Sequence, residues 1–253
     1  MCGRFAIATM PELLRERFGY VDQPNFPPRY NIAPTQPVPV VTIIEGRRRF
    51  VLMRWGFLPG WVKDPNEFPL VINIRAETAR EKPSFRAAFQ RRRGLMPVDG
   101  FYEWRRDGRA STPFLIRRRD GGPFAFPALW ETWASADGSE IDTAALMTTE
   151  ATGALQTIHP RAPIILDPKS WEEWLDPATT PDRAEALLKE PLQGELELRR
   201  IGLGVNKVSN DGPEIQAEAG EEDLAPPPKA TRPPKSVAKP TKTGGGGEQG
   251  SLF

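Results

Sequence analysis

Residues 37–55 read PVPVVTIIEGRRRFVLMRW and contain the pattern that decides the fold. Two apolar runs, PVPVVTIIE and RFVLMRW, flank the short polar stretch EGRR. Runs rich in Val, Ile, Leu and Phe on either side of a glycine-containing turn are typical of a β-hairpin. The segment therefore predicts two antiparallel strands.

Further strands and some helices are expected on both sides of this hairpin. GLMPVDGFYEW and PFLIRRR flank RRDGR in the same manner, and strands are also favoured at RFAIA, VINIRAET, PFAFPALW, IDTAALMTTE and ELELRRI. Helices are expected at PELLRERFG, where Pro11 suits the first turn and Gly19 the C-terminal stop, and at PSFRAAFQRR, SWEEWL and PDRAEALLKE. The predicted class is α+β with a mainly antiparallel sheet and flanking helices.

The composition indicates one domain followed by a tail. A chain of 253 residues with 39% hydrophobic content can bury one sizeable core. From about Glu221 the composition changes to Pro, Lys, Thr and Gly, and such a segment cannot bury enough apolar surface to order itself. We expect a domain over residues 1–220 and a disordered tail over residues 221–253.

The chain has one cysteine and one histidine, which limits its chemistry. One cysteine excludes an intramolecular disulfide, and zinc sites built from Cys and His clusters lack their ligands. We expect no metal and no cofactor. The sequence has neither a signal-like start nor about 18 consecutive apolar residues, so a soluble, cytoplasmic protein is expected. We also expect a monomer.

Charge is unevenly distributed along the chain. Residues 1–120 hold 22 Lys+Arg and 12 Asp+Glu, a net of +10, although the whole chain has a net charge of +1. Such runs can be solvated surface, or they can form a phosphate-binding face if the fold gathers them. The arginines in question are at positions 47–49, 54, 75, 80, 86, 91–93, 105, 106, 109 and 117–119.

Cys2 is informative because of its position. Removal of Met1 would place its thiol and the α-amine on adjacent carbons. A free α-amine has a pKa of about 7.7–8.0 and a thiol one of about 8.5, so both are partly nucleophilic near neutrality. An aldehyde can form a Schiff base with the amine, and the tethered thiol can then close a thiazolidine ring. The alternative is that Cys2 is an ordinary buried side chain.

Two further side chains can move protons. Glu103 stands within the apolar stretch GFYEW, where burial of its carboxyl would raise its pKa; an outward-facing strand glutamate is the alternative. His159 is the single histidine, and histidine is the side-chain type that titrates near neutrality. It precedes a predicted strand in IHPRAPIIL, and nearby Arg161 indicates an anion site, although a lone histidine is more often structural.

Polar and aromatic side chains could contact a nucleic acid. Asn73 and Arg75 in VINIRAET share one face of a probable strand, since alternate strand residues point the same way. An amide and a guanidinium on one face could hold a sugar and a phosphate. Trp55, Trp61 and Trp104 could stack on unpaired bases, or simply belong to the core.

Seven motifs in order carry a family resemblance. They are MCGRFA, RYNIAPTQ, WGFLPGW, NIRAET, GFYEW, HPRAP and VNKVSNDGPE, and they span Met1 to about Glu214. In this order they resemble the SOS-response-associated peptidases, the SRAP family. The resemblance implies a compact, mixed β-barrel with flanking helices. It also implies an autopeptidase that removes its own first methionine and a lyase-like enzyme of DNA repair that forms a thiazolidine crosslink with abasic sites in single-stranded DNA.

The resemblance also implies roles for individual residues. Cys2 would be the nucleophile, Glu103 the general acid and base, Asn73 would position the α-amine or the sugar hydroxyl, and His159 would assist ring opening. The family's DNA contacts fall on Arg4, Pro34, Trp61, Arg75, Trp104 and Arg161. The implied partner is single-stranded DNA with abasic sites, which would associate the protein with the nucleoid.

Two other functions compete with this interpretation. Class II glutamine amidotransferases also begin with Met-Cys-Gly, but their usual Asn-Gly pair for the oxyanion hole does not occur in this chain. A non-catalytic single-stranded DNA-binding module would use the basic half alone. Retention of Met1 without abasic-site trapping would indicate that module, and glutaminase activity would indicate the amidotransferase.

The C-terminus ends in QGSLF. Gln249, Leu252 and Phe253 resemble the peptide by which bacterial repair proteins bind the sliding clamp, the glutamine at the mouth of a pocket and the apolar pair on its floor. A chance match at the end of a tail is the alternative. Clamp binding is therefore a prediction for a bacterial source.

Overall fold

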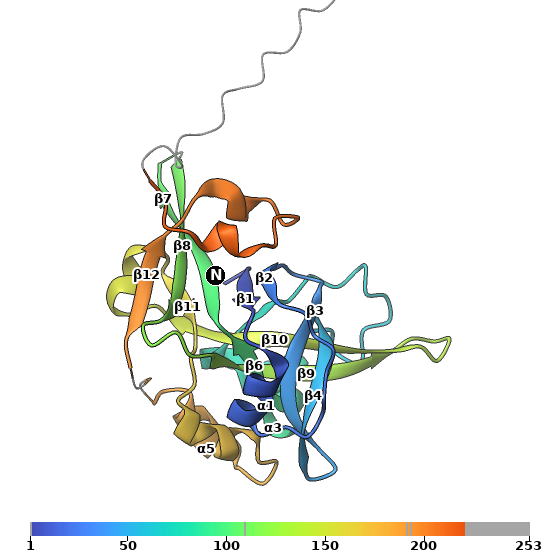
Figure 1. The fold of residues 1–253 in the computed structure, drawn as a ribbon. Coiled ribbons are helices and arrows are strands. Elements are labelled where there is room, and N and C mark those ends of the chain that lie inside the picture. Colours follow the sequence, from blue (N-terminus) through green and yellow to red (C-terminus); the bar gives the residue numbers. More distant parts are fainter. Residues whose placement is uncertain (1, 109, 191, 193, 221–253) are drawn as a thin grey trace, which may run out of the picture.

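The structure is a computed structural model that describes residues 2–220 except 109, 191 and 193 (Figure 1). The strands in this part of the chain are β1 (Phe5–Ile7), β2 (Arg29–Ile32), β3 (Pro37–Ile44), β4 (Arg47–Trp55), β5 (Asn73–Arg75), β6 (Arg93–Val98), β7 (Gly100–Asp107), β8 (Ala110–Arg118), β9 (Phe124–Ala134), β10 (Glu140–Glu150), β11 (Arg161–Pro163) and β12 (Leu196–Arg200). The α-helices are α1 (Pro11–Phe18), α2 (Ala76–Ala79), α3 (Pro83–Arg91), α4 (Trp171–Leu175) and α5 (Pro181–Leu187), and the 3-10 turns are η1 (Gly153–Thr157), η2 (Pro168–Ser170), η3 (Leu203–Asn206) and η4 (Pro213–Gln216).

Five strands close into a barrel. The pairing runs from β10 to β4, β3, β6 and β9, and β9 pairs with β10 again. The β10–β4 pair is parallel and the other pairs of the ring are antiparallel. Closure leaves these strands without an open edge that could pair with another chain. The short strands β5 and β11 pair with the far end of β10, so they bring their residues to one end of the barrel.

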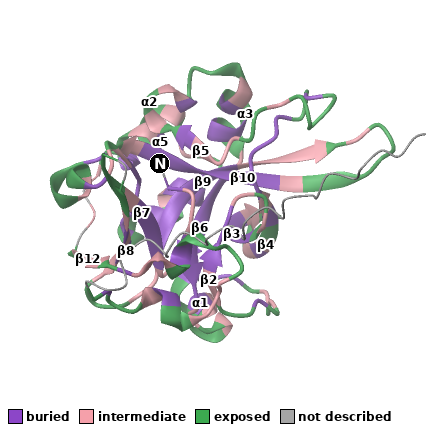
Figure 2. Cartoon of the chain, turned by 90° about the horizontal axis from the view of Figure 1, so that it is seen from above, coloured by how far each residue is buried: buried purple, intermediate pink, exposed green. Residues whose placement is uncertain are grey.

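A second sheet lies beside the barrel. Its strand order is β12–β8–β7–β1–β2, and all its pairs are antiparallel. The main core is rich in buried aromatic side chains, among them Phe5, Trp55, Phe101 and Phe126. Figure 2 shows buried residues along the strands of both sheets. Ring contacts from Phe5 of β1 to Trp55 of β4 and to Phe126 of β9 join the sheet to the barrel.

The predicted α+β class with mainly antiparallel strands and flanking helices is confirmed. The hairpin expected at residues 37–55 is confirmed: Val40 lies opposite Val51, and the chain turns at Glu45 and Gly46, whose φ angles are +51° and +74°. Two consecutive positive φ values define the type I′ turn that suits the twist of a hairpin. Helix α1 begins at Pro11 and ends at Gly19, which has the left-handed φ of +68°, as predicted.

One strand prediction was wrong. GLMPVDGFYEW is two strands in different sheets, because Asp99 turns the chain between β6 and β7 and its carboxylate accepts hydrogen bonds from the N–H groups of Ala8 and Thr9 at 2.6 and 2.7 Å. The strand expected at Asn73 and Arg75 within VINIRAET is confirmed, and helix α2 begins directly after it.

The predicted tail of residues 221–253, including the clamp motif, lies outside the described residues. Among the described helices, none is both long and apolar enough to span a membrane.

Candidate active site

Cys2 precedes β1 in the interior of the protein. The register of β1 on β7 sets Phe5 opposite Phe101, and the N–H of Tyr102 donates to the carbonyl of Arg4 at 3.0 Å. This pairing carries the first residues of the chain toward Glu103. The Cys2 side chain is fully buried, and its Sγ lies 3.6 Å from the Arg4 carbonyl oxygen.

The sequence suggested a partly ionised Cys2 thiol, but the structure favours the neutral form. Burial raises the pKa of the Cys2 thiol well above its ordinary value, and the negative charge of Glu103 raises it further. The sulfur is therefore a neutral thiol at neutral pH, and it needs a proton acceptor when it reacts.

Asn73 holds the backbone of Cys2. Its Nδ2 donates a hydrogen bond of 2.9 Å to the Cys2 carbonyl oxygen. Strand β5 fixes this amide, because Asn73 pairs with Leu146 in the parallel β5–β10 ladder. Asn73 Oδ1 is buried and accepts no hydrogen bond from the described residues. An amide oxygen can accept a hydrogen bond from a further donor, such as an amine or a hydroxyl.

Glu103 faces the interior from β7. It is 5% exposed, whereas its neighbours Tyr102 and Trp104 lie on the opposite face of the strand against a second, smaller apolar cluster. Burial raises the pKa of the Glu103 carboxyl, and the nearby His159 counteracts part of this rise. These interactions bring Cys2, Glu103 and His159 into one electrostatic site, and a carboxyl with a raised pKa can both donate and accept protons.

His159 lies on the loop before β11. Its Nδ1 is 3.0 Å from the backbone nitrogen of Arg161 and 3.0 Å from the Arg161 carbonyl oxygen. A neutral ring with an unprotonated Nδ1 accepts from this N–H, and the imidazolium donates from Nδ1 to this carbonyl. These contacts to the backbone of Arg161 thus fix the orientation of the His159 ring.

The two arginines expected to hold phosphates differ. The side chain of Arg75 is exposed, and within the described part of the chain it has no hydrogen bond or ion pair. Arg161 forms two hydrogen bonds to the Glu77 carboxylate, at 2.8 and 3.0 Å, and a third to the Thr148 carbonyl at 2.9 Å. Arg75 is therefore available to an anion, whereas Arg161 is engaged within the protein.

Arg4 and Trp104 form a cation–π pair. The guanidinium carbon of Arg4 lies 6.0 Å from the centre of the Trp104 ring. Arg4 donates to Asn31 Oδ1 at 2.7 Å and to the carbonyl of Val205 at 2.8 Å, so its charge has no carboxylate partner among these contacts. A cation bound only by carbonyl oxygens keeps its attraction for phosphate.

The other two expected contacts lie on loops. Strands β1 and β2 are antiparallel, with Phe5 opposite Ile32. The half-buried Pro34, two residues after Ile32, therefore lies near the residues that precede β1. Thr35, which follows it, has a φ of +73°. Trp61 lies on the loop between β4 and β5, is 64% exposed and has an edge contact with Phe68. Pro34 is thus beside the candidate active site, and Trp61 presents a free ring face.

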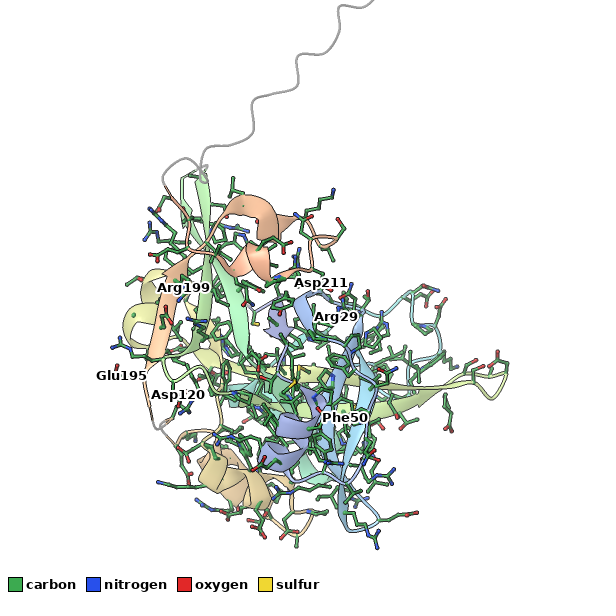
Figure 3. The ribbon with its side chains drawn as sticks, viewed as in Figure 1. Arg29, Phe50, Asp120, Glu195, Arg199 and Asp211 are labelled. Carbon is green, nitrogen blue, oxygen red and sulfur yellow. The ribbon has the colours of Figure 1, made fainter. Side chains whose placement is uncertain are left out.

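Several arginines of the basic half form ion pairs with carboxylates. Arg49 pairs with Asp22, Arg92 with Glu131, and Arg117 with Glu197. Asp120 and Glu195, labelled in Figure 3, receive two further arginines of the 117–119 run. Glu131, Glu195 and Glu197 come from the acidic half of the chain, whereas Asp22 and Asp120 lie in the basic half itself. The net charge around these arginines is therefore smaller than the composition suggested. The arginines without carboxylate partners are therefore the better candidates for phosphate binding.

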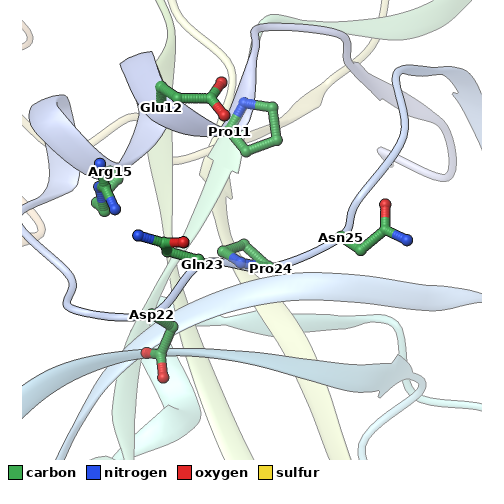
Figure 4. A pocket seen from close by; sticks show the side chains of 7 residues that line it. All are labelled: Pro11, Glu12, Arg15, Asp22, Gln23, Pro24 and Asn25. Atoms are coloured by element: carbon green, nitrogen blue, oxygen red, sulfur yellow. The ribbon is translucent and has the colours of Figure 1, made fainter.

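A surface pocket of about 330 Å³ lies between α1 and the segment of residues 22–25 (Figure 4). None of the candidate catalytic residues lines it; its lining is Pro11, Glu12, Arg15, Asp22, Gln23, Pro24 and Asn25. The pocket is not part of the site at Cys2.

Sequence reasoning missed three residues that organise the site. Glu77 engages Arg161, Asn31 engages Arg4, and Asn206 engages Trp104. Each lies within a motif that the sequence singled out, NIRAET, RYNIAPTQ or VNKVSNDGPE, but the motifs alone do not show which side chains meet.

A family model described as SOS response associated peptidase (SRAP) matches residues 1–208. The chain belongs to this family. It is 34% identical over 220 residues to the abasic site processing protein YoqW of Bacillus subtilis, an alignment that covers 85% of this chain and 98% of that protein. It is also 29% identical over 225 residues to the abasic site processing protein YedK of Escherichia coli, covering 85% and 98%.

Solved structures show the same fold. A protein from Bacteroides thetaiotaomicron superposes with a TM-score of 0.79 at 24% identity, covering 86% of this chain and all of that chain. A phage-related protein from Bordetella bronchiseptica superposes with a TM-score of 0.65 at 29% identity, covering 79% and 94%. The SRAP fold expected from the motifs is therefore confirmed.

Proposed function

We propose that this SRAP protein captures abasic sites in single-stranded DNA by forming a thiazolidine through Cys2. One observation carries the proposal: Asn73 holds the Cys2 carbonyl at 2.9 Å while the thiol lies buried in the field of Glu103. An N-terminal aminothiol next to a buried proton donor and acceptor suits condensation with an aldehyde. The names of the relatives agree with this substrate.

The first step frees the α-amine. Cys2 Sγ adds to the carbonyl carbon of Met1, and the C–N bond breaks to leave a thioester and the amine of Cys2. Glu103 accepts the thiol proton and returns it to the departing amine. Water then hydrolyses the thioester, so that one water is consumed and methionine is released. Asn73 keeps the Cys2 backbone in place throughout, because it binds the Cys2 carbonyl oxygen and not the Cys2 nitrogen, where the peptide bond breaks.

The second step forms the crosslink. The ring-opened sugar presents an aldehyde at C1′, to which the α-amine adds. Glu103 protonates the hydroxyl of this adduct, which leaves as water and gives a Schiff base, and His159 assists the preceding ring opening. Sγ then bonds to C1′ while its proton passes to the imine nitrogen. One water is lost overall and nothing is oxidised or reduced.

The neutral state of the thiol fits this order of events. A buried thiolate would cost solvation energy, whereas a neutral thiol that loses its proton only as the C–S bond forms avoids that cost. The amine attacks first and the sulfur closes the ring afterwards, in an intramolecular step with a large entropic advantage.

The test is incubation of the purified protein with a single-stranded abasic oligonucleotide, followed by denaturing electrophoresis. Wild type should give a heat-stable crosslink, Cys2→Ala none, and Cys2→Ser at most a labile one. Mass spectrometry should show that wild type has lost Met1. A crosslink undiminished in Cys2→Ala would overturn the mechanism, and retention of Met1 without trapping would indicate a plain DNA-binding module.

Family membership favours this function over the amidotransferase. Glutaminase activity in the same preparation would reverse that preference. A protein bound to abasic sites in chromosomal DNA would be found on the nucleoid.

A further inference from the structure

The loop of residues 203–211, which we call the clasp, takes no part in the chemistry above. It belongs to the segment drawn in orange beside the N-terminus in Figure 1. Asp211 attaches the clasp to β2: its carboxylate accepts from the N–H groups of Tyr30 and Asn31 at 2.5 and 2.7 Å and from Arg29 Nε at 2.5 Å. Figure 3 shows Arg29 and Asp211 close together.

A buried asparagine connects the clasp to Arg4. Asn31 Nδ2 lies within 2.8–3.2 Å of the backbone carbonyls of residues 205, 207 and 210, and its Oδ1 accepts from Arg4 at 2.7 Å. Asn31 is fully buried, so these contacts are shielded from water. The backbone of the clasp and the position of Arg4 are therefore coupled.

The clasp also holds the indole of Trp104. Asn206 Oδ1 accepts a hydrogen bond of 2.7 Å from Trp104 Nε1, and the Asn206 carbonyl lies 3.4 Å from Arg4 Nη2. The indole has one donor, and this bond uses it. Trp104 is only half-buried, so core packing does not fix its ring on every side. One residue thus binds both members of the Arg4–Trp104 pair.

We propose that Asn206 is a positioning residue that fixes the Trp104 ring beneath Arg4 and so presents it to the nucleotide beside the captured sugar. This inference rests on the proposed function. A ring that is already oriented loses less side-chain freedom when a base stacks on it, and the effect falls on DNA affinity and not on the chemical step.

The test compares four proteins: wild type, Asn206→Ala, Trp104→Phe and the double variant. Trp104→Phe keeps an aromatic ring but lacks the donor, so it breaks the same bond from the other side. The DNA concentration that gives half-maximal crosslinking should rise roughly three- to tenfold in Asn206→Ala, with the maximal rate unchanged within about twofold. Both substitutions remove the same hydrogen bond between Asn206 and Trp104. The double variant should therefore need no higher DNA concentration for half-maximal crosslinking than Trp104→Phe alone.

A matched control is Asn210→Ala. It removes the hydrogen bond from Asn210 Nδ2 to the Gly204 carbonyl, which is 2.9 Å long and lies within the clasp, but leaves every backbone carbonyl in place. It should keep wild-type half-saturation. Wild-type half-saturation in Asn206→Ala, additive losses in the double variant, or an equal loss in Asn210→Ala would overturn the inference.

A second measurement separates this inference from the proposed function. Fluorescence anisotropy with a single-stranded oligonucleotide that carries a tetrahydrofuran, an unreactive abasic analogue, reports binding without chemistry. If wild type forms no crosslink, the proposed function fails, and the same four proteins still test the positioning role by affinity. Equal affinity of all four would overturn the positioning role alone.

Discussion

The side-chain amide of Asn73 donates a hydrogen bond of 2.9 Å to the backbone carbonyl of Cys2. This bond ties the start of the chain to β5, 71 residues further on. Asn73→Asp keeps the shape of the side chain but replaces the donor with a second acceptor, so attraction to the carbonyl becomes repulsion. We expect the single-turnover crosslinking rate to fall by roughly 10²-fold, the loss that about 1 Å of misplacement can cause.

Asn25→Asp is the control for this substitution. Asn25 is exposed at the pocket of Figure 4, so the same chemical change there should leave the crosslinking rate at the wild-type value. A normal rate in Asn73→Asp would show that the contact does not position Cys2.

Glu103 should lower stability while it supports activity. Burial raises its pKa, so the folded state favours the protonated form. The contribution of Glu103 to the free energy of unfolding is therefore most favourable below the unfolded pKa of about 4.3, and it is lost as the pH rises through the folded pKa. Glu103→Gln should therefore raise Tm at pH 8 by about 2–4 °C for each kcal/mol relieved, and should change it little at pH 4.

The same variant should react slowly. Without a group that exchanges protons, crosslinking should slow by roughly 10²–10⁴-fold while DNA affinity stays nearly intact, and His159→Ala should behave similarly. Glu197→Gln is the control, because Arg199 and Arg117 lower the pKa of Glu197 and its loss should not stabilise the fold. A Tm gain in Glu197→Gln equal to that in Glu103→Gln would point to a general charge effect.

Arg93 stabilises the packing of the helices on the barrel. Its buried guanidinium donates to the carbonyls of Phe89 and Gln90 at the end of α3, and to Trp174 and Asp176 at the end of α4. Arg93→Met would leave these carbonyls without their donors, at a cost of about 3 kcal/mol or more, measured by urea unfolding. The neighbouring Arg91→Met, at an exposed position, should change stability by less than about 0.5 kcal/mol. Equal effects would contradict this role.

The strands and helices were largely predictable, because hairpin turns and helix caps are local. The two-residue turn at Glu45 and Gly46 and the stop at Gly19 depend only on neighbouring residues. The break at Asp99 was not predictable, because it depends on hydrogen bonds to Ala8 and Thr9 about 90 positions away.

The candidate site shows the same division. Motifs singled out Cys2, Asn73, Glu103 and His159 as candidates, but the sequence left open whether Glu103 faces inward, and the structure shows that it is buried. Composition left open whether the basic runs form a phosphate-binding face, because ion pairs between distant segments, such as Arg117 with Glu197, depend on the fold. Nor could the sequence distinguish Arg75 from Arg161, since both occur in motifs of similar polarity.

Arg75 and Arg161 should respond differently to substitution. Arg75 is exposed and unpaired within the described residues, so Arg75→Ala should weaken single-stranded DNA binding and reduce the slope of log K against log salt by about 0.7, without changing Tm. Arg161→Ala removes the partner that lowers the pKa of Glu77 and leaves that carboxylate facing the site. It should lower Tm and also weaken DNA binding, through an unpaired negative charge.

A double variant separates the two effects at Arg161. If the freed carboxylate causes the loss of binding, Arg161→Ala with Glu77→Gln should bind DNA more tightly than Arg161→Ala alone, because the repulsion of phosphate is removed. If Arg161 itself holds a phosphate, the second change should restore nothing and the salt slope should stay reduced. Arg86→Ala, on the exposed face of α3, is the control and should leave both the slope and Tm unchanged. Titrations of the five proteins at several salt concentrations decide between a structural ion pair and a direct phosphate contact.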